Sequence, residues 1–193
     1  MQTNLGNYAF IDSQNLNLAT QNLGWKVDWQ RFRQYLKEHY AVEVAYLFIG
    51  YIPENQDLYA FLQKAGFVLV FKPVVAAKDG SVKGNIDAEL VMQVMLDLAH
   101  YDKAVIVTGD GDFHVLINYL YGQGKLAALL VPNQHQYSQL LKSAARDQIQ
   151  FMNQLRRRLE YRNHRSRKPS KTAAETRPAQ DSAAHESELP QTG

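Results

Sequence analysis

Short apolar runs rich in β-branched and aromatic residues recur along the first 132 residues of the chain, separated by stretches with helical spacing. The runs are mostly continuous rather than alternating, which is typical of parallel strands covered on both faces. Parallel strands joined through helices take right-handed crossovers, so the pattern predicts an α/β fold, a three-layer α/β/α sandwich with a mainly parallel central sheet. The predicted strands are residues 8–12, 42–52, 67–75, 103–109 and 125–132.

The connections between these runs carry helix signals. Asp28 is placed to cap the first connecting helix, proline opens the second, and glycine ends the second and the last. The predicted helices are residues 29–40, 53–66, 85–99 and 113–124.

Basic residues are concentrated in one segment of the chain. Residues 154–171 hold 8 Lys+Arg against 1 Asp+Glu, whereas residues 1–153 hold 12 against 14 and residues 172–193 hold 1 against 4. The last of these segments has the Ala, Pro, Ser and Glu bias of a chain that cannot build a core. We therefore expect a folded domain over residues 1–160, followed by a basic and then low-complexity, disordered tail over residues 161–193.

The sequence contains no cysteine, which excludes disulfides, thiolate metal sites and cysteine nucleophiles. We find neither a signal sequence nor an apolar run of ~18 residues, so we expect a cytoplasmic protein with no membrane partner. The closing LPQTG resembles a sortase recognition sequence, but no apolar segment and basic tail follow it, and we interpret it as chance or a tag. The sequence leaves the oligomeric state open, including a homodimer.

Four aspartates are expected at one edge of the predicted sheet. Asp12 ends the first strand, Asp110 and Asp112 follow the fourth, and Asp87 lies in the first turn of the helix after the third. Ligands of open parallel sheets bind beyond the carboxyl ends of the strands. Each aspartate taken alone could instead cap a helix or a turn, Asp112 before the helix that starts at Phe113 among them. Four like charges at one edge call for a cation.

Carboxylates without cysteine form an all-oxygen ligand set, which selects Mg²⁺ or Mn²⁺. Such ions can hold a water for in-line attack on phosphorus and neutralise charge on the leaving oxygen. A phosphate-binding glycine loop would place two negative charges against its anion, and an EF-hand loop needs a glutamate where Tyr121 stands. We therefore predict metal-assisted phosphodiester hydrolysis, with four catalytic and metal-binding residues: Asp12, Asp87, Asp110 and Asp112.

Three segments, in this order and spacing, resemble the NYN domain of the PIN-like nuclease superfamily, in its LabA-like bacterial branch: FIDSQNL (10–16), KGNIDAELVMQVMLDLA (83–99) and VIVTGDGDFHVLINYL (105–120). The resemblance covers residues 7–155. It implies a PIN-like, Rossmannoid sandwich, a Mg²⁺- or Mn²⁺-dependent ribonuclease site and RNA as the substrate. By motif, it assigns the four aspartates to the acid positions of the family and Thr108 to the small hydroxyl position before the acidic pair.

The chain departs from that family pattern at one position. Many relatives carry a further acid two turns after the position of Asp87, where this sequence has Val94. Asp97 lies about 80° around the helix from Asp87 and would reach only the margin of the site, so we expect a solvated helix-end residue. The sequence leaves open whether the site holds one metal ion or two.

Several residues are candidates for binding the substrate. Lys83 could contact a scissile phosphate, and Asn15 could hold Asp12 or a metal-bound water. The basic stretch that begins with Arg156, Arg157 and Arg158 has the composition of a nucleic-acid-binding arm, with a solvated helix and tail as the alternative. Lys78 and the aromatic residues Trp25, Trp29 and Tyr51 could extend such a groove, although the two tryptophans are also spaced as a core pair.

We predict a metal-dependent endoribonuclease. Two alternatives stay open: an RNA-binding regulatory module with a weak or vestigial nuclease site, and a nonspecific phosphodiesterase acting on DNA or small nucleotides. Retention of all four acids favours the enzyme, and an open site together with a basic arm favours a polymeric substrate.

Overall fold

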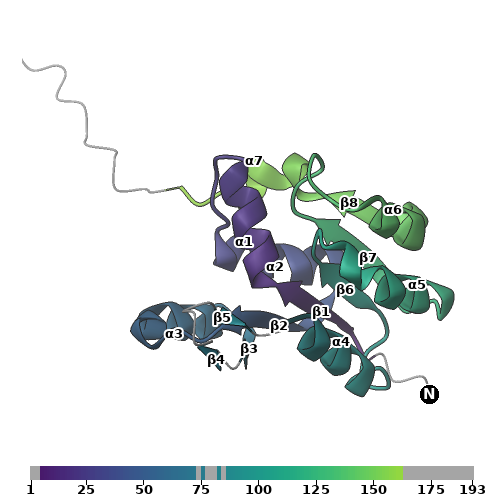
Figure 1. Cartoon of the computed structure of the whole chain (residues 1–193), viewed down its shortest axis with the longest axis horizontal. Helices are drawn as coiled ribbons and strands as arrows, with labels where there is room; N and C mark the ends of the chain where they lie inside the picture. The colour runs from purple at the N-terminus through teal and green to yellow at the C-terminus, as the bar shows by residue number, and fades with distance from the viewer. Residues whose placement is uncertain (1–4, 73–74, 77–81, 84–85, 163–193) are drawn as a thin grey trace, which may run out of the picture. The chain divides into compact units, whose positions relative to one another are not determined.

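Six parallel strands form a sheet at the centre of the described chain (Figure 1). The computed structural model describes residues 5–72, 75–76, 82–83 and 86–162. The strand order is β3-β2-β1-β6-β7-β8, and each neighbouring pair is parallel. This is the doubly wound order 3-2-1-4-5-6, which reverses between β1 and β6. The strands are β1 (Asn7–Asp12), β2 (Val42–Gly50), β3 (Val68–Lys72), β6 (Ala104–Val107), β7 (Leu126–Val131) and β8 (Ile149–Phe151).

Helices cover both faces of this sheet. Alternate residues of β1 show the division, because Ala9 and Ile11 pack into one core and Phe10 into the other. The first core is closed by α1 (Ser13–Asn22), α2 (Trp29–Tyr40), α3 (Gln56–Lys64) and α7 (Arg156–Leu159), and the second by α4 (Ile86–Leu96), α5 (His114–Gly122) and α6 (Gln139–Ala145). Burial on both faces explains the continuous apolar runs. The predicted three-layer α/β/α sandwich is confirmed.

Some elements differ from the sequence predictions. Strand β8 was not predicted, because three residues at a sheet edge carry too little periodicity to stand out. A two-stranded antiparallel hairpin, β4 (Val75–Ala76) and β5 (Val82–Lys83), follows the shorter-than-predicted β3. Short 3₁₀ turns occupy η1 (Pro53–Asn55), η2 (Gly111–Phe113), η3 (Arg146–Gln148) and η4 (Met152–Leu155). None of the described helices has the length and apolar character needed to cross a bilayer.

The last described segment packs back onto the start of α2. Leu159 is fully buried, and its carbonyl accepts the N–H of Asp28 at 2.7 Å. The Tyr161 N–H donates to the carbonyl of Lys26 at 2.8 Å. The cap predicted for α2 is also present, since the Asp28 carboxylate accepts the Arg31 N–H at 3.1 Å. The predicted tail covers residues 161–193, of which 163–193 lie outside the described residues, and the domain boundary at residue 160 stays a prediction.

Candidate metal centre

Asp12 is a nearly buried carboxylate at the carboxyl end of β1, where the strand order reverses. One oxygen caps α1 by accepting the Asn15 N–H at 3.0 Å, and the other accepts the Thr108 hydroxyl at 3.4 Å. Burial raises the pKa of Asp12, and the negative charges of Asp87 and Asp110 raise it further. The two hydrogen bonds lower this pKa, but by less than the other effects raise it. Asp12 is therefore both a helix cap and a carboxylate whose environment favours a proton or a cation.

The acidic turn after β6 is held by hydrogen bonds between its own residues. The Thr108 hydroxyl oxygen accepts the Asp110 N–H at 3.1 Å, and the Asp110 carboxylate accepts the Asp112 N–H at 3.0 Å. Asp110 therefore caps η2, whereas Asp112 lies inside that turn and no side chain caps α5. The capping role considered for Asp112 from the sequence is wrong. Its carboxylate is exposed beside the other acids.

Close packing explains why a glycine separates the two aspartates. A Cβ atom at Gly111 would lie 2.7 Å from the Cβ of Ser138, the residue that caps α6. On the other side of the turn, the Asn15 side-chain oxygen accepts the Gly109 N–H at 2.8 Å. Asn15, expected to hold Asp12 or a water, therefore contacts Asp12 through its backbone and anchors the acidic turn through its side chain.

Three carboxylates meet at this edge of the sheet. Asp87, from the first turn of α4, joins Asp110 and Asp112, and each residue offers an oxygen within 4.8 Å of the others. Burial raises the pKa of Asp87, as do the charges of Asp110 and Asp112. If Mg²⁺ bound here, these three carboxylates would hold it through oxygen, the ligand atom that this ion prefers. The all-oxygen set fits a hard divalent cation.

Lys72 is a cation near the acids that the sequence analysis missed. It is the last residue of β3 and is half-buried, and its charge lowers the pKa of Asp87. The sequence signal that could have identified Lys72 was a single basic residue at the carboxyl end of an apolar run. For Lys83, the structure places the backbone in β5, opposite Val75, and its side chain lies outside the described residues, as does Lys78.

The departure at Val94 leaves the cluster without a further acid from α4. Val94 is fully buried in the second core. Asp97 lies just beyond the last turn of α4, where its carboxylate accepts the Gln93 amide at 2.8 Å. Burial raises the pKa of Tyr101, and the charge of Asp97 raises it further. Asp97 follows Asp87 by ten positions, which places the two residues about 15 Å apart along the helix axis. Asp97 therefore does not reach even the margin of the site.

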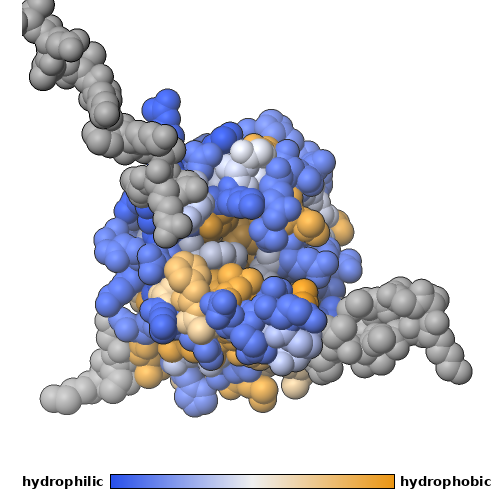
Figure 2. All heavy atoms as spheres, turned by 90° about the vertical axis from the view of Figure 1, so that its left-hand side faces the viewer, coloured by the Kyte–Doolittle hydropathy of each residue, from blue (hydrophilic) through white to orange (hydrophobic). Residues whose placement is uncertain are grey.

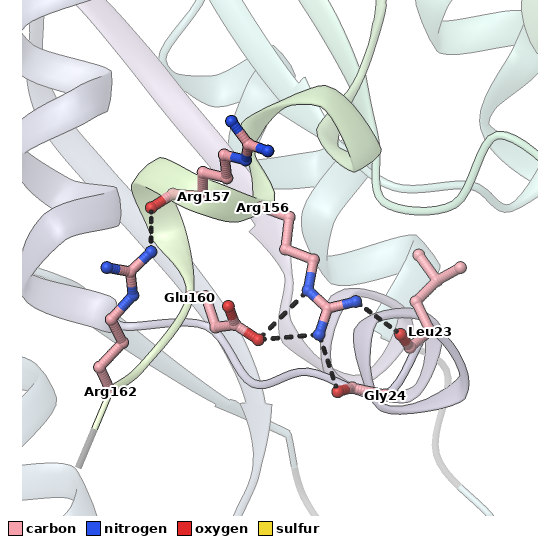
Figure 3. A network of polar contacts seen from close by, with 6 residues as sticks. All are labelled: Leu23, Gly24, Arg156, Arg157, Glu160 and Arg162. Atoms are coloured by element: carbon pink, nitrogen blue, oxygen red, sulfur yellow. Dashed lines mark hydrogen bonds and ion pairs between the residues drawn. The ribbon is translucent and has the colours of Figure 1, made fainter.

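Arg156 is committed to contacts within the fold (Figure 3). Its guanidinium pairs with Glu160 at 2.9 Å and donates to the carbonyls of Leu23 and Gly24 at 3.5 and 3.4 Å. These carbonyls follow the last turn of α1, whereas Asp12 caps its first turn. The ten residues of α1 span about 15 Å, so Arg156 lies roughly one helix length from Asp12.

Arg157 and Arg158 differ from each other in their contacts. Arg158 pairs with Glu38 at 2.9 Å, and its guanidinium lies over the Tyr35 ring at 5.1 Å. The Arg157 side chain makes no hydrogen bond or ion pair in the part of the chain that the structure describes, and in Figure 3 it points away from the Arg156 network. Among the three arginines, Arg157 has the guanidinium best placed for an external anion.

Comparisons with known proteins agree with this architecture. The sequence model of the NYN domain family matches residues 8–153. The chain is 30% identical over 122 residues to the low amplitude and bright protein LabA of Synechococcus elongatus, an alignment that covers 58% of this chain and 65% of LabA. A crystal structure of a protein of unknown function from Vibrio parahaemolyticus has the same fold, with a TM-score of 0.65, 22% identity, and coverage of 79% of this chain and 96% of that one.

NYN domains are typically nucleases, and the cluster of Asp87, Asp110 and Asp112 could bind a metal ion. The chain spans slightly less than two thirds of the length of LabA. The sequence resemblance, the family match and the fold lead to the same assignment: the chain belongs to the NYN domain family and is LabA-like within it.

Proposed function

We propose that the protein is a metal-dependent endoribonuclease whose site consists of Asp12, Asp87, Asp110 and Asp112. The observation that carries the proposal is the meeting of three carboxylates within 4.8 Å, beside a fourth that is nearly buried. Their position is the switch point of a doubly wound sheet, where such folds bind their ligands. The raised pKa values of Asp12 and Asp87 support a site built for a positive charge.

In this proposal, oxygens of the partly buried Asp87 and Asp110 and of the exposed Asp112 would hold Mg²⁺ or Mn²⁺, and Asp12 would close the buried side of the site. When bound, such an ion supplies a water of lowered pKa and a positive charge next to the leaving oxygen. Thr108 fixes Asp12 and the backbone of Asp110 relative to each other. The bound ion also offsets the repulsion between the aspartates and an incoming phosphate.

Residues around the acids supply the contacts to the RNA backbone. Lys72, at the end of β3, carries a positive charge near Asp87 and is proposed to contact a phosphate beside the scissile bond. Lys83 stays a candidate for contacting the same RNA strand. Thr108 is fully buried and is assigned to fixing Asp12 and Asp110, and Asn15 is assigned to holding the acidic turn. Arg157 is proposed to contact a phosphate farther along the RNA, and Arg156 and Arg158 to support α7 through their ion pairs.

Cleavage assays on labelled RNA test the proposal. The purified full chain is incubated with single-stranded RNA, structured RNA and DNA of the same sequence, in Mg²⁺, Mn²⁺ or EDTA. The matched control is Asp102→Asn, the same substitution just before the amino end of β6 rather than after its carboxyl end. We expect metal-dependent RNA cleavage by the wild type and the control, and a loss of at least ~100-fold in Asp110→Asn, in line with the removal of a charge-stabilising group.

The outcomes separate the alternatives. RNA binding without cleavage under every metal condition would make the protein an RNA-binding module with a vestigial site. Equal cleavage of RNA and DNA would indicate a nonspecific phosphodiesterase. Wild-type rates in Asp110→Asn would remove the acidic cluster from the mechanism.

A further inference from the structure

A cavity of about 520 Å³ opens beside the first turn of α1, which Asp12 caps, and its volume is within the ~300–1,000 Å³ range of small-molecule sites. Its walls come from α1, the start of α2, the end of β2 and α3. Ser13 and Gln14, which line it, directly follow Asp12 in the chain. Figure 2 looks onto the side of the molecule that carries α3 and shows hydrophobic residues gathered around a hollow. The cavity and the metal centre therefore share the first turn of α1.

The lining of this cavity combines aromatic surface with uncharged polar groups. Trp29 and Tyr51 contribute rings, and Ile49, Leu58 and Leu62 contribute aliphatic surface. The amides of Gln14 and Asn55 also line it, and neither side chain makes a hydrogen bond to another described residue. No lining residue that the structure describes is charged. This chemistry suits a flat, uncharged ring with hydrogen-bonding edges.

Tyr51 is held in place before any ligand arrives. The residue is 43% exposed, and its ring packs against Tyr59 and Phe71, with centroid separations of 6.0 and 5.5 Å. Its hydroxyl accepts the amide of Gln56 at 3.1 Å. The Tyr59 hydroxyl accepts the Ile52 N–H at 2.7 Å, which fixes the backbone on the far side of Tyr51. An aromatic surface that is already ordered costs little conformational entropy to use.

We propose that this cavity binds one nucleobase of the RNA strand whose phosphodiester lies at the aspartates, an inference that rests on the proposed function. A phosphate is disfavoured there, because none of the described residues that line the cavity is cationic, and Asp12 directly precedes two of them in the chain. A base fits both parts of the lining. Stacking on Trp29 or Tyr51 is tolerant of sequence, and the amides of Gln14 and Asn55, which bond to no other described side chain or backbone group, can meet the edge of the base. The cavity would thus set which nucleotide lies next to the cut.

Tryptophan fluorescence tests base binding without any need for cleavage. The chain has 2 tryptophans, and Trp25 is buried, so Trp25→Phe leaves Trp29 as the reporter. Adenosine, guanosine, cytidine and uridine are titrated in turn, with ribose as the control. We expect at least one nucleoside to quench Trp29 saturably and ribose to have no effect. A saturable shift of the Trp29 emission by N-acetyl-leucine amide, with no saturable change by any nucleoside, would assign the cavity to a protein side chain and overturn the proposal.

Filling the cavity gives a second, independent test. A Cβ atom at Gly50, which lines the cavity, meets no heavy atom within 4 Å, and the same holds at Gly122 on α5. Gly50→Leu therefore fills the cavity, and Gly122→Leu is the matched control. In the Asp110→Asn protein, we expect Gly50→Leu to raise the dissociation constant of a hexaribonucleotide about tenfold, which equals ~1.4 kcal/mol and lies within the value of stacking one base. Gly122→Leu should leave the constant unchanged.

Further readouts keep this inference separate from the proposed function. Tyr51→Ala replaces Gly50→Leu in the binding measurement if Gly50→Leu fails to fold. In the active protein, either variant should raise KM by more than it lowers kcat. Nucleoside quenching in a protein that cleaves no RNA would overturn the nuclease and leave a base-binding site standing. Metal-dependent cleavage with no quenching, and with equal RNA binding by Gly50→Leu and Gly122→Leu, would overturn the base site alone.

Discussion

The Thr108 hydroxyl donates to the Asp12 carboxylate at 3.4 Å, across 96 positions of sequence. The same oxygen accepts the Asp110 N–H at 3.1 Å. Thr108 is fully buried at the end of β6, and Asp12 ends the neighbouring β1. One side chain therefore couples the buried acid to the acidic turn at the point where the strand order reverses.

Thr108→Val should weaken Mn²⁺ binding. Valine keeps the shape of threonine but removes both hydrogen bonds, so Asp12 and Asp110 lose their common support. Loss of such an outer partner typically costs ~10–100-fold in metal affinity, and we expect a loss in that range by isothermal titration calorimetry. Thr108→Ser keeps the hydroxyl and should bind Mn²⁺ with nearly wild-type affinity. Equal affinities for the valine and serine variants would rule out this role for Thr108.

Asp12→Asn should stabilise the metal-free protein at neutral pH. The folded-state pKa of Asp12 is raised above its ordinary 3.8, so the folded protein binds the proton more tightly and loses stability as pH rises through that folded pKa. Asparagine caps a helix about as well as aspartate but carries no charge. We expect thermal melts to show a gain of about 2–4 °C at pH 7, the shift that ~1 kcal/mol gives a chain of this size.

Near pH 3.5 the gain in melting temperature from Asp12→Asn should disappear. The carboxyl group of Asp12 is then protonated in the folded wild type, so it is uncharged like the asparagine of the variant. Asp102→Asn, outside the acidic site, should show no comparable dependence on pH. A gain of the same size at pH 3.5 and pH 7 would mean that Asp12→Asn acts through packing rather than charge.

Manganese should make the wild type more stable than its variants with asparagine in the acidic site, which reverses the order expected without metal. An ion that binds only the folded state stabilises it by ~2.7 kcal/mol at a concentration one hundred times its dissociation constant. Millimolar Mn²⁺ is therefore expected to raise the melting temperature of the wild type. The variant with asparagine at all four acidic positions should show no increase. Equal increases in both proteins would place the bound ion elsewhere.

The position of the acids was accessible from the sequence because it follows from topology alone. Continuous apolar runs identify parallel strands, and residues that end such strands share one edge of the sheet. Asp12 and Asp110 were found in this way. Lys72 was missed because its nearness to Asp87 depends on the position of β3 at the edge of the sheet, beside β2. Periodicity does not encode strand order.

The basic run near the C-terminus shows a different limit of the sequence. A cluster of arginines predicts a positively charged surface, yet Arg158 pairs with Glu38, which is 120 positions away. This ion pair cannot be predicted from the sequence, because the two residues meet only when α2 and α7 pack together in the fold. For Arg156, the glutamate four residues later was a readable signal, since side chains at that spacing meet on a helix. Charge counting alone treated the three arginines as equivalent, and their contacts distinguish them.

Arg157 provides the test of whether α7 contacts RNA. Its guanidinium has no partner among the described residues, whereas Arg158 is held by Glu38 and Tyr35. If Arg157 binds one phosphate of a single strand, Arg157→Gln should reduce the slope of log affinity against log salt by about 0.7. Arg158→Gln is the matched control, because it removes the same charge from a guanidinium already engaged within the fold, and its slope should change by less.

The measurement uses Asp110→Asn protein and a labelled single-stranded RNA over ~50–300 mM salt, a range in which phosphate contacts dominate the response. Truncation after Asn153 is unsuitable here, because it would remove the fully buried Leu159, and the loss of such a side chain costs ~2–5 kcal/mol even as an alanine substitution. Both glutamine variants keep Leu159 and the hydrogen bond between its carbonyl and Asp28.

In the active protein, Arg157→Gln should raise KM and leave kcat nearly unchanged, because a phosphate contact remote from the aspartates is made equally in the ground and transition states. Identical slopes for Arg157→Gln, Arg158→Gln and their parent would show that α7 is a solvated end of the domain with no part in RNA binding.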